Sequence, residues 1–354
     1  MYHKIEKLKS IGLKKRKVVL IGPFPPPIGG VSIHIKRIMS MLRDEIDFEI
    51  IDEAKNAKEG IFNLRSKNIF RYFKIVKKAD VVHIHSGVFI LRMFHIMLCR
   101  IFLRKFTVVT IHHDPNTEKH ILLTKWLLSR CNHAILVNKQ GYEMMKIPST
   151  CKYHLLPAFL PPIIDEEPFL PLEVTKWIHS RRAEGSSVSV SNAWNLLLHN
   201  GIDLYGLDLC IEAFRLLNEK TKGKYSLLFV VASNTSNQEM IEIYKKKIAE
   251  YHLEKNILIW EEPLSFVRLV MESDLVLRAT NTDGDALSLR EALFMGKTVI
   301  ASDVVNRPDG TVLFKNRDAN DLAKKIEENV NNIGVERKHV TNNFANDYLK
   351  IYYS

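Results

Sequence analysis

The sequence predicts an α/β protein that consists of two βαβ domains. Short apolar runs alternate with helical segments in both halves of the chain, and a proline-rich stretch separates the halves. The length of 354 residues is enough for two hydrophobic cores. A hydrophobic content of 46% and a charged content of 26% are those of a globular protein, which excludes the disordered class.

The first domain, residues 17–160, contains apolar runs of the kind found in parallel strands that are covered on both faces. Right-handed crossovers between such strands build a doubly wound sheet, whose ligand crevice lies at the carboxyl ends of the strands. The expected strands are 17–21, 48–51, 81–84, 108–111 and 134–137, and the expected helices are 31–42, 62–78, 87–103, 118–131 and 139–147.

A linker and a second series of strands and helices follow. Residues 161–171 combine prolines with acidic residues, which is typical of an interdomain linker. Residues 172–335 form the second domain, and residues 336–354 form a C-terminal helix. The strands expected in the second domain are 196–199, 225–232, 257–260, 275–277 and 298–301, and the helices are 207–219, 237–250 and 318–330.

The basic charge of the chain belongs to its first half. Residues 1–171 carry 28 Lys and Arg against 15 Asp and Glu, whereas residues 172–354 carry 23 against 25. Such a surplus serves solubility, an anionic membrane surface or a polyanionic substrate. It is not accompanied by an aromatic RNA-binding motif or a helix-turn-helix pattern, so we expect no nucleic-acid partner. Residues 1–16 are a basic lead-in that forms either a weak interfacial helix or a disordered tail.

Cysteine usage and hydropathy predict a cytoplasmic protein. The four cysteines show no CxxC spacing, which fits a reducing compartment. The lead-in lacks the apolar core of a secretory signal. The longest apolar run, residues 88–103, is interrupted by Arg92 and Arg100 and falls short of a membrane span. We expect the protein to be cytoplasmic, either soluble or peripheral at the inner face of a membrane.

A polar loop lies between the strand that ends at Arg278 and the next helix. It contains Asp283, Gly284 and Asp285, and Ser288 and Glu291 follow it. A strand that feeds a helix through such a loop directs free backbone N–H groups at one point, where the helix dipole favours phosphate. Two carboxylates beside that point can hold sugar and ribose hydroxyls. The alternative is that Ser288 and Glu291 only form a capping box.

A second loop, residues 22–30, follows the first strand and ends in Gly29 and Gly30. Its prolines fix the path of the chain, while the two glycines leave bare backbone in front of the helix 31–42. A phosphate or a sugar can approach such a backbone closely. A Gly-Gly pair before a helix also marks an ordinary tight turn.

Histidines follow two neighbouring strands of the first domain. His83 and His85 follow one of them, and His112, His113 and Asp114 follow the other. Satisfied structural histidines are one interpretation. The other is a site for Zn²⁺ or another divalent metal, which would make the protein a metal-dependent hydrolase.

The polar loop and the glycine loop both resemble motifs of one family. An acidic residue, a Glu eight positions later, Gly296 and the strand TVIASD resemble the donor-site signature of the GT-B glycosyltransferases, specifically the retaining glycosyl transferase group 1 family. The family normally has Glu at the first acidic position, where this chain has Asp283. The stretch GPFPPPIGGVSIHIKRI resembles the first loop of the same family, and Thr110-Ile111-His112 matches its T-x-H motif.

The resemblance implies two Rossmann-like domains that face each other across a central cleft, the first for the acceptor and the second for a nucleotide sugar. It implies that His112 contacts the reacting sugar, that Asp283 holds the transferred sugar and that Glu291 holds the ribose. The backbone of the residues Asp285, Ala286, Leu287 and Ser288 would face the diphosphate, with Gly29 and Gly30 across the cleft. It also implies retention of configuration without a metal, so the DxD spelling of residues 283–285 is discounted.

One departure concerns the charge on the diphosphate. The family usually has an Arg and a Lys after the first strand of the second domain, but the matching positions here are Asn200 and Tyr205. A leaving nucleoside diphosphate needs a positive group, and Arg278 is the best-placed substitute. Arg290, Lys297 and Arg307 are weaker candidates.

We therefore expect a glycosyltransferase that moves a sugar from a nucleotide-sugar donor to a saccharide acceptor and uses no cofactor. The basic first half suggests an acceptor on a lipid diphosphate, as in surface polysaccharide biosynthesis. Two alternatives stay open: the metal-dependent hydrolase, and a catalytically silent binding subunit that lacks the usual cations.

Overall fold

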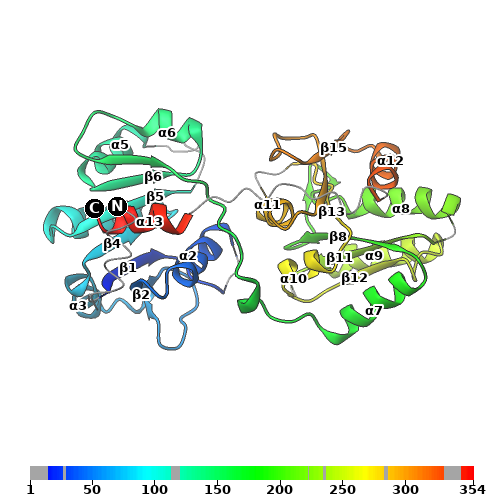
Figure 1. Ribbon diagram of the computed structural model, residues 1–354, viewed down its shortest axis with the longest axis horizontal. Coiled ribbons are helices and arrows are strands. Elements are labelled where there is room, and N and C mark those ends of the chain that lie inside the picture. The colour runs from blue at the N-terminus through cyan, green and yellow to red at the C-terminus, as the bar shows by residue number, and fades with distance from the viewer. Residues whose placement is uncertain are drawn as a thin grey trace. The chain divides into compact units, whose positions relative to one another are not determined.

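The computed structural model describes residues 15–26, 29–112, 120–221, 223–233, 237–282, 286–330 and 344–354. The chain divides into two compact units, Met1–Leu160 with Asn342–Ser354, and Pro161–Thr341. Each unit is a parallel sheet covered by helices (Figure 1). Within the described residues, no helix combines the length and the apolar character that a membrane span requires.

The first unit has a sheet in the strand order β3-β2-β1-β4-β5-β6-β7. All its neighbouring strands are parallel, and β1 pairs with β2 on one side and with β4 on the other. The sheet is therefore doubly wound, with its topological switch point between β1 and β4. The strands are β1 (Arg16–Gly22), β2 (Ile46–Asp52), β3 (Phe62–Asn63), β4 (Val81–Ile84), β5 (Phe106–Ile111), β6 (His133–Leu136) and β7 (Lys152–Leu155).

Helices cover both faces of this sheet because successive residues of each strand point to opposite faces. In β1, Val19 and Ile21 pack against the first group of helices, and Val18 and Leu20 pack against the second. The first group is α3 (Ile69–Lys78), α4 (Phe89–Ile96), the π-helical η2 (Met97–Phe102), α5 (Ile121–Arg130) and α6 (Lys139–Met145). The second is α2 (Gly30–Met41) and the C-terminal α13 (Phe344–Tyr352).

The second unit has the strand order β12-β11-β8-β13-β14-β15, again all parallel, with its switch point between β8 and β13. The strands are β8 (Ser187–Ala193), β11 (Tyr225–Val231), β12 (Ile257–Trp260), β13 (Leu275–Arg278), β14 (Thr298–Ser302) and β15 (Val312–Phe314). The helices are α7 (Leu172–Ala183), α8 (Leu207–Thr221), α9 (Gln238–Glu250), α10 (Phe266–Met271), α11 (Leu287–Phe294) and α12 (Ala319–Val330). A two-stranded hairpin, β9 (Leu198–His199) and β10 (Ile202–Asp203), lies outside the sheet.

The prediction of the first strand of this unit was wrong. We expected it at 196–199, but the central strand is β8, and 198–199 belong to the small hairpin. In β8 serines alternate with valines, and Ser189 and Ser191 are as buried as Val188 and Val190. Serine is small enough for the interior of the sheet, but it interrupts the apolar run that identifies a buried strand.

Helix boundaries also differ from the prediction. The expected helix 62–78 begins only at Ile69, because β3 and the 3-10 turn Leu64–Ser66 precede it. The expected helix 87–103 is divided into α4 and η2. Helix α7 was not predicted at all, since it buries few residues: Val174, Ile178 and Arg181.

Candidate functional site

Polar side chains gather at the switch point of the second sheet. Arg278 ends β13, and its Nη1 donates to the backbone oxygen of Asn192 at 3.0 Å and to the side-chain oxygen of Asn192 at 3.4 Å. Asn192 lies near the end of β8. The Arg278 guanidinium lies 5.2 Å from the centre of the Tyr205 ring. A positive group is thus held beside Tyr205, one of the two positions where the resemblance places a cation, while Asn200 is exposed at the turn between β9 and β10.

The N-terminus of α11 follows the same switch point. Helix α11 begins at Leu287 with Ala286 as its N-cap residue, and Ala286 has no side chain that can cap the helix. Ser288 lies within the first turn, so the capping-box interpretation is wrong. Glu291 lies on the second turn and is 5% exposed. Asp283 and Asp285 lie outside the described residues.

The N-terminus of α8 contrasts with that of α11. The carboxylate of Asp203 accepts hydrogen bonds from the backbone N–H groups of Tyr205 at 2.9 Å, Gly206 at 3.2 Å and Leu207 at 3.0 Å. The Tyr244 hydroxyl donates to the same carboxylate at 2.8 Å. The positive end of α8 is therefore already neutralised by the protein, whereas at α11 the N-cap residue Ala286 makes no side-chain cap hydrogen bond.

The loop before α8 lies directly against the residues that follow Arg278. Gly206 has φ +73°, and a Cβ at this position would lie 2.1 Å from the backbone oxygen of Ala279. Any other residue would both strain the backbone and push the loop away from β13. The Asn281 N–H also donates to the Leu204 oxygen at 3.1 Å. This packing fixes Tyr205 beside Arg278.

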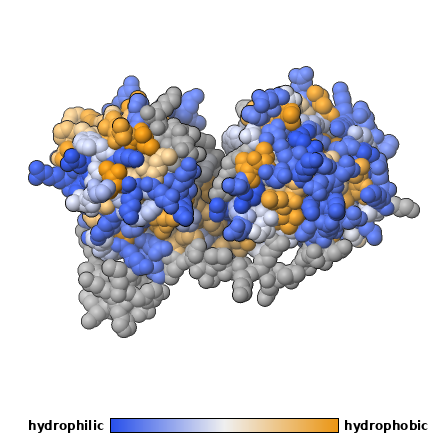
Figure 2. All heavy atoms as spheres, turned by 90° about the horizontal axis from the view of Figure 1, so that it is seen from above, coloured by the Kyte–Doolittle hydropathy of each residue, from blue (hydrophilic) through white to orange (hydrophobic). Residues whose placement is uncertain are grey.

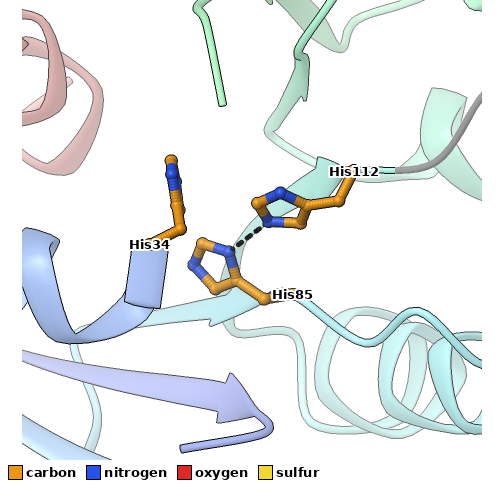
Figure 3. Close-up of side chains that lie close together, drawn as sticks. All are labelled: His34, His85 and His112. Carbon is orange, nitrogen blue, oxygen red and sulfur yellow. Dashed lines mark hydrogen bonds between the residues drawn. The ribbon is translucent and has the colours of Figure 1, made fainter. Parts of the chain in front are cut away.

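The first unit has a histidine cluster at its own switch point. His34 comes from α2, His85 follows β4 and His112 follows β5, and their rings point toward one another (Figure 3). One ring nitrogen of each lies within 4.8 Å of the others. His85 Nδ1 lies 3.0 Å from His112 Nε2, and the buried His85 Nε2 has no hydrogen-bond partner among the described residues.

Hydrogen bonds hold His34 in one tautomer. Its Nδ1 lies 2.7 Å from the Ala158 backbone oxygen, which only accepts, so Nδ1 carries the proton. Its Nε2 then accepts from the Tyr348 hydroxyl at 3.1 Å. Sequence reasoning missed His34, because its place in the cluster follows only once α2 is known to begin at the switch point of the sheet.

His83 has a structural environment of its own. Its Nδ1 lies 2.7 Å from the Tyr352 hydroxyl and its Nε2 lies 2.7 Å from the Thr110 hydroxyl, so both ring nitrogens are engaged. His83 therefore does not join His34, His85 and His112 as a candidate ligand. His113 and Asp114, which the sequence placed in the same metal site, lie outside the described residues.

Burial keeps these histidines neutral. It lowers the pKa of His34 to about 4 and the pKa of His83 and His85 well below the usual value. The positive charge of Arg37 adds to the effect for His34, and the neighbouring imidazoles, which cannot all be protonated together, add to it for His85. A neutral imidazole can accept a hydrogen bond from a sugar hydroxyl or bind a metal ion.

The glycine loop lies beside the histidine cluster. A Cβ at Gly22, the last residue of β1, would lie 2.8 Å from the Ile35 side chain and 3.0 Å from His85 Cβ, so glycine allows β1 and His85 to approach. Gly29 is the N-cap residue of α2, and its N–H donates to the Ser32 hydroxyl at 2.9 Å. A Cβ at Gly30 would meet no described atom within 4 Å, so the space in front of it is open on the part of the chain described here.

Comparison with known proteins identifies one family in sequence. Residues 198–332 match the family described as Glycosyl transferases group 1. The matched segment contains Tyr205, Arg278, Glu291 and the helix α11. No curated protein sequence matches the chain.

Solved structures match nearly the whole chain. A glycosyltransferase from Rickettsia africae superposes with a TM-score of 0.66 at 18% identity, and covers 96% of this chain and 98% of its own. Anabaena HepE in complex with UDP and glucose has a TM-score of 0.60 at 14% identity, with coverage of 95% and 98%. Sucrose-phosphate synthase from Thermosynechococcus elongatus has a TM-score of 0.57 at 14% identity, with coverage of 96% and 95%. The predicted α/β fold is confirmed.

Proposed function

We propose that this chain, which has the GT-B fold and a glycosyl transferases group 1 segment in its second unit, is a glycosyltransferase that uses a nucleotide-sugar donor. One observation carries the proposal. The switch point of the second sheet combines Arg278, Glu291 and the N-terminus of α11, and these lie within the matched segment.

Each of these groups suits one part of a nucleoside diphosphate sugar. The N-terminus of α11, with Ala286, Leu287 and Ser288, offers backbone N–H groups and a positive dipole to the diphosphate. Arg278 stabilises the negative charge that develops on the leaving diphosphate. Glu291 accepts hydrogen bonds from the ribose. That HepE was solved with UDP and glucose supports a donor of this class.

The first unit would bind the acceptor and contact the reacting sugar. His112 is half-buried next to the neutral His85, with Gly29 and Gly30 nearby on the loop before α2. We propose a saccharide acceptor on a lipid diphosphate, as in surface polysaccharide biosynthesis, and transfer with retention at the anomeric carbon, with Asp283 against the transferred sugar. The reaction would need no metal or cofactor, and the protein would act in the cytoplasm at the inner face of the membrane.

A thermal-shift panel with UDP, GDP, ADP and CMP, each with and without EDTA, tests the donor site. A ligand at about 100 times its dissociation constant stabilises the native state by about 2.7 kcal/mol, which raises the melting temperature by a few degrees. We expect one nucleoside diphosphate to stabilise the protein regardless of EDTA. Stabilisation that disappears with EDTA would contradict metal independence, and the absence of any shift would contradict the donor site.

The histidine cluster favours one second candidate, a metal-dependent hydrolase. Three imidazoles with ring nitrogens within 4.8 Å of one another match the donor set of catalytic zinc sites. Both nitrogens of His34 already have hydrogen-bond partners, however, and a metal would have to displace Tyr348 or Ala158. A melting temperature that falls with EDTA alone would favour the hydrolase. A catalytically silent binding subunit would instead bind the nucleotide without turnover of any nucleotide sugar.

A further inference from the structure

One layer of helices on the first unit exposes many large apolar side chains. Helices α3 and α4 are neighbours in this layer, since the Tyr72 ring lies 6.0 Å from Phe94 and the Tyr72 hydroxyl lies 2.8 Å from His95 Nδ1. Both α4 and η2 contact α5. We define the apolar helical face by the exposed residues Ile69, Phe70, Val88, Ile90, Phe94, Ile101, Phe102, Leu122, Leu123 and Trp126.

The exposure of these side chains is large. Phe70 is 85% exposed, Leu122 is 78% exposed and Phe102 is 71% exposed. Figure 2 shows hydrophobic residues gathered on part of the surface of the first unit. In the second unit, by contrast, the described helices expose only Leu172, Ile243 and Met271 as large apolar residues. Large exposed apolar side chains concentrated on one layer of helices indicate an interaction site rather than ordinary surface.

The charge of the apolar helical face is of one sign. The sequences of α3, α4, η2 and α5 contain no Asp or Glu at all. The basic residues in them are Arg71, Lys74, Lys77, Lys78, Arg92, Arg100, Lys125 and Arg130. Those of α3 and α5 form no ion pair with another described residue. Helices α3 and α5 therefore offer positive charge without an acidic partner in the described chain, next to the apolar side chains of the face.

A groove beside Phe70 is lined by several of these basic residues. It has a volume of about 450 Å³, and Arg71, Lys74 and Lys78 of α3 line it together with Lys17 of β1 and Glu49 of β2. Lys17 is paired with Glu49 at 2.6 Å, whereas the three basic residues of α3 have no such partner in the described chain. Such a groove suits an anionic headgroup next to an inserted aromatic side chain.

We propose that the apolar helical face docks on an anionic lipid bilayer. Apolar side chains inserted at the headgroup boundary and basic side chains at its surface are the two contributions that hold a peripheral protein on such a membrane. The absence of acidic residues from the four elements removes the repulsion that anionic lipids would otherwise meet. A second copy of the chain fits less well, because a two-fold interface would bring the same positive face against itself.

Membrane docking through this face does not require the proposed glycosyltransferase activity. It would explain why a protein with a lipid-linked acceptor carries its basic surplus in the first half. The two proposals fail separately, since vesicle binding needs no nucleotide sugar and nucleotide binding needs no vesicle.

Co-sedimentation of the full chain with vesicles tests the docking face. Vesicles of phosphatidylcholine alone are compared with vesicles that also contain phosphatidylglycerol, at low and at high salt. We expect binding to the anionic vesicles that weakens at high salt, because the electrostatic part is screened. Leu122→Asp should lower the partition coefficient at least tenfold, since it removes an inserted side chain and adds a negative charge. Lys77→Ala should lower it about fivefold.

The matched control is Ile243→Asp, which places the same charge on an exposed apolar position of α9 in the second unit. It should leave vesicle binding unchanged, and all three variants should keep the wild-type nucleotide-induced thermal shift. Wild-type protein that stays in the supernatant with anionic vesicles would overturn the proposal. So would equal loss of binding in Ile243→Asp, or a dimer in light scattering that Leu122→Asp dissociates while the wild type ignores vesicles.

Discussion

The two units place different chemistry at the same position of the same kind of sheet. At the switch point of the first sheet lie His34, His85 and His112; burial keeps His34 and His85 neutral, and His85 lies within hydrogen-bond distance of His112. At the switch point of the second lie Arg278 and Glu291, at the end of β13 and on α11. A neutral centre suits the hydroxyls of a sugar, whereas a charged centre beside a helix N-terminus suits a diphosphate. The fold provides the position, and the side chains decide which ligand fits it.

The largest effect is expected when the charge of the second centre is removed. Arg278→Ala should lower turnover by about 10²–10³-fold, because it removes the preorganised positive group proposed to face the leaving diphosphate. Arg278→Lys should recover part of the loss. The control is Arg215→Ala, which removes an exposed guanidinium that pairs with Glu212 and Glu219 on α8. Near-normal turnover of Arg278→Ala in a nucleotide-sugar assay would contradict the role of Arg278.

Glu291→Gln tests the other charged group of the second centre. A hydrogen bond to a charged group contributes about 1.5–3 kcal/mol, so nucleoside diphosphate affinity should fall roughly 10–100-fold. The side chain keeps its size, and Glu291 is almost fully buried, so melting of the free protein serves as the control for folding. Calorimetric titration with the diphosphate identified by thermal shift measures the effect. Unchanged affinity would mean that Glu291 only supports the fold.

Acid should affect the first unit and not the second. The folded pKa of His34, about 4, lies below its ordinary value of 6.5, so the unfolded chain takes up a proton first as pH falls. The contribution of neutral His34 to stability is complete above pH 6.5 and is lost between pH 6.5 and 4. Its size is on the order of 3 kcal/mol, and the lowered pKa of His83 and His85 acts in the same direction.

Hydrogen exchange measured for each segment of the chain at pH 7 and at pH 4.5 tests whether acid destabilises the first unit and not the second. All fully buried histidines among the described residues belong to the first unit. We expect β4 and β5 to lose protection at the lower pH, while β11 and β13 keep theirs. Equal loss in both units would show that the neutral histidines do not set the acid sensitivity.

The sequence predicts the strands best where β-branched apolar residues dominate a short run. The predicted ranges 81–84 and 257–260 coincide with β4 and β12. The same approach fails for β8, where serine takes buried positions. A sequence pattern indicates burial only where the residues are apolar, so a strand that buries small polar residues is not detected.

The candidate sites are predicted less completely than the strands. Their residues come from separate segments, which only the strand order of the sheet brings together. Arg278 and Glu291 lie in one continuous segment, and local pattern reasoning identifies both. His34 joins the first cluster only because α2 begins at the switch point, and no local signal in α2 states this. Asp203 did carry a signal that we did not use, since an Asp just before a helix is a standard N-cap residue.

The smallest effect we predict concerns the C-terminal helix α13. This helix belongs to the first unit, so its loss of contacts should affect the histidine cluster and not the second unit. Helix α13 is more than 200 residues away in sequence from the strands it packs on, and its Tyr352 hydroxyl lies 2.7 Å from His83 Nδ1. Tyr352→Phe leaves this buried nitrogen without its partner, so the free energy of unfolding should fall by about 1–3 kcal/mol. Tyr225→Phe is a matched control, since Tyr225 belongs to the core of the second unit. If urea unfolding shows equal effects for both variants, the hydroxyl of Tyr352 does not stabilise the histidine centre, and α13 holds it through apolar packing alone.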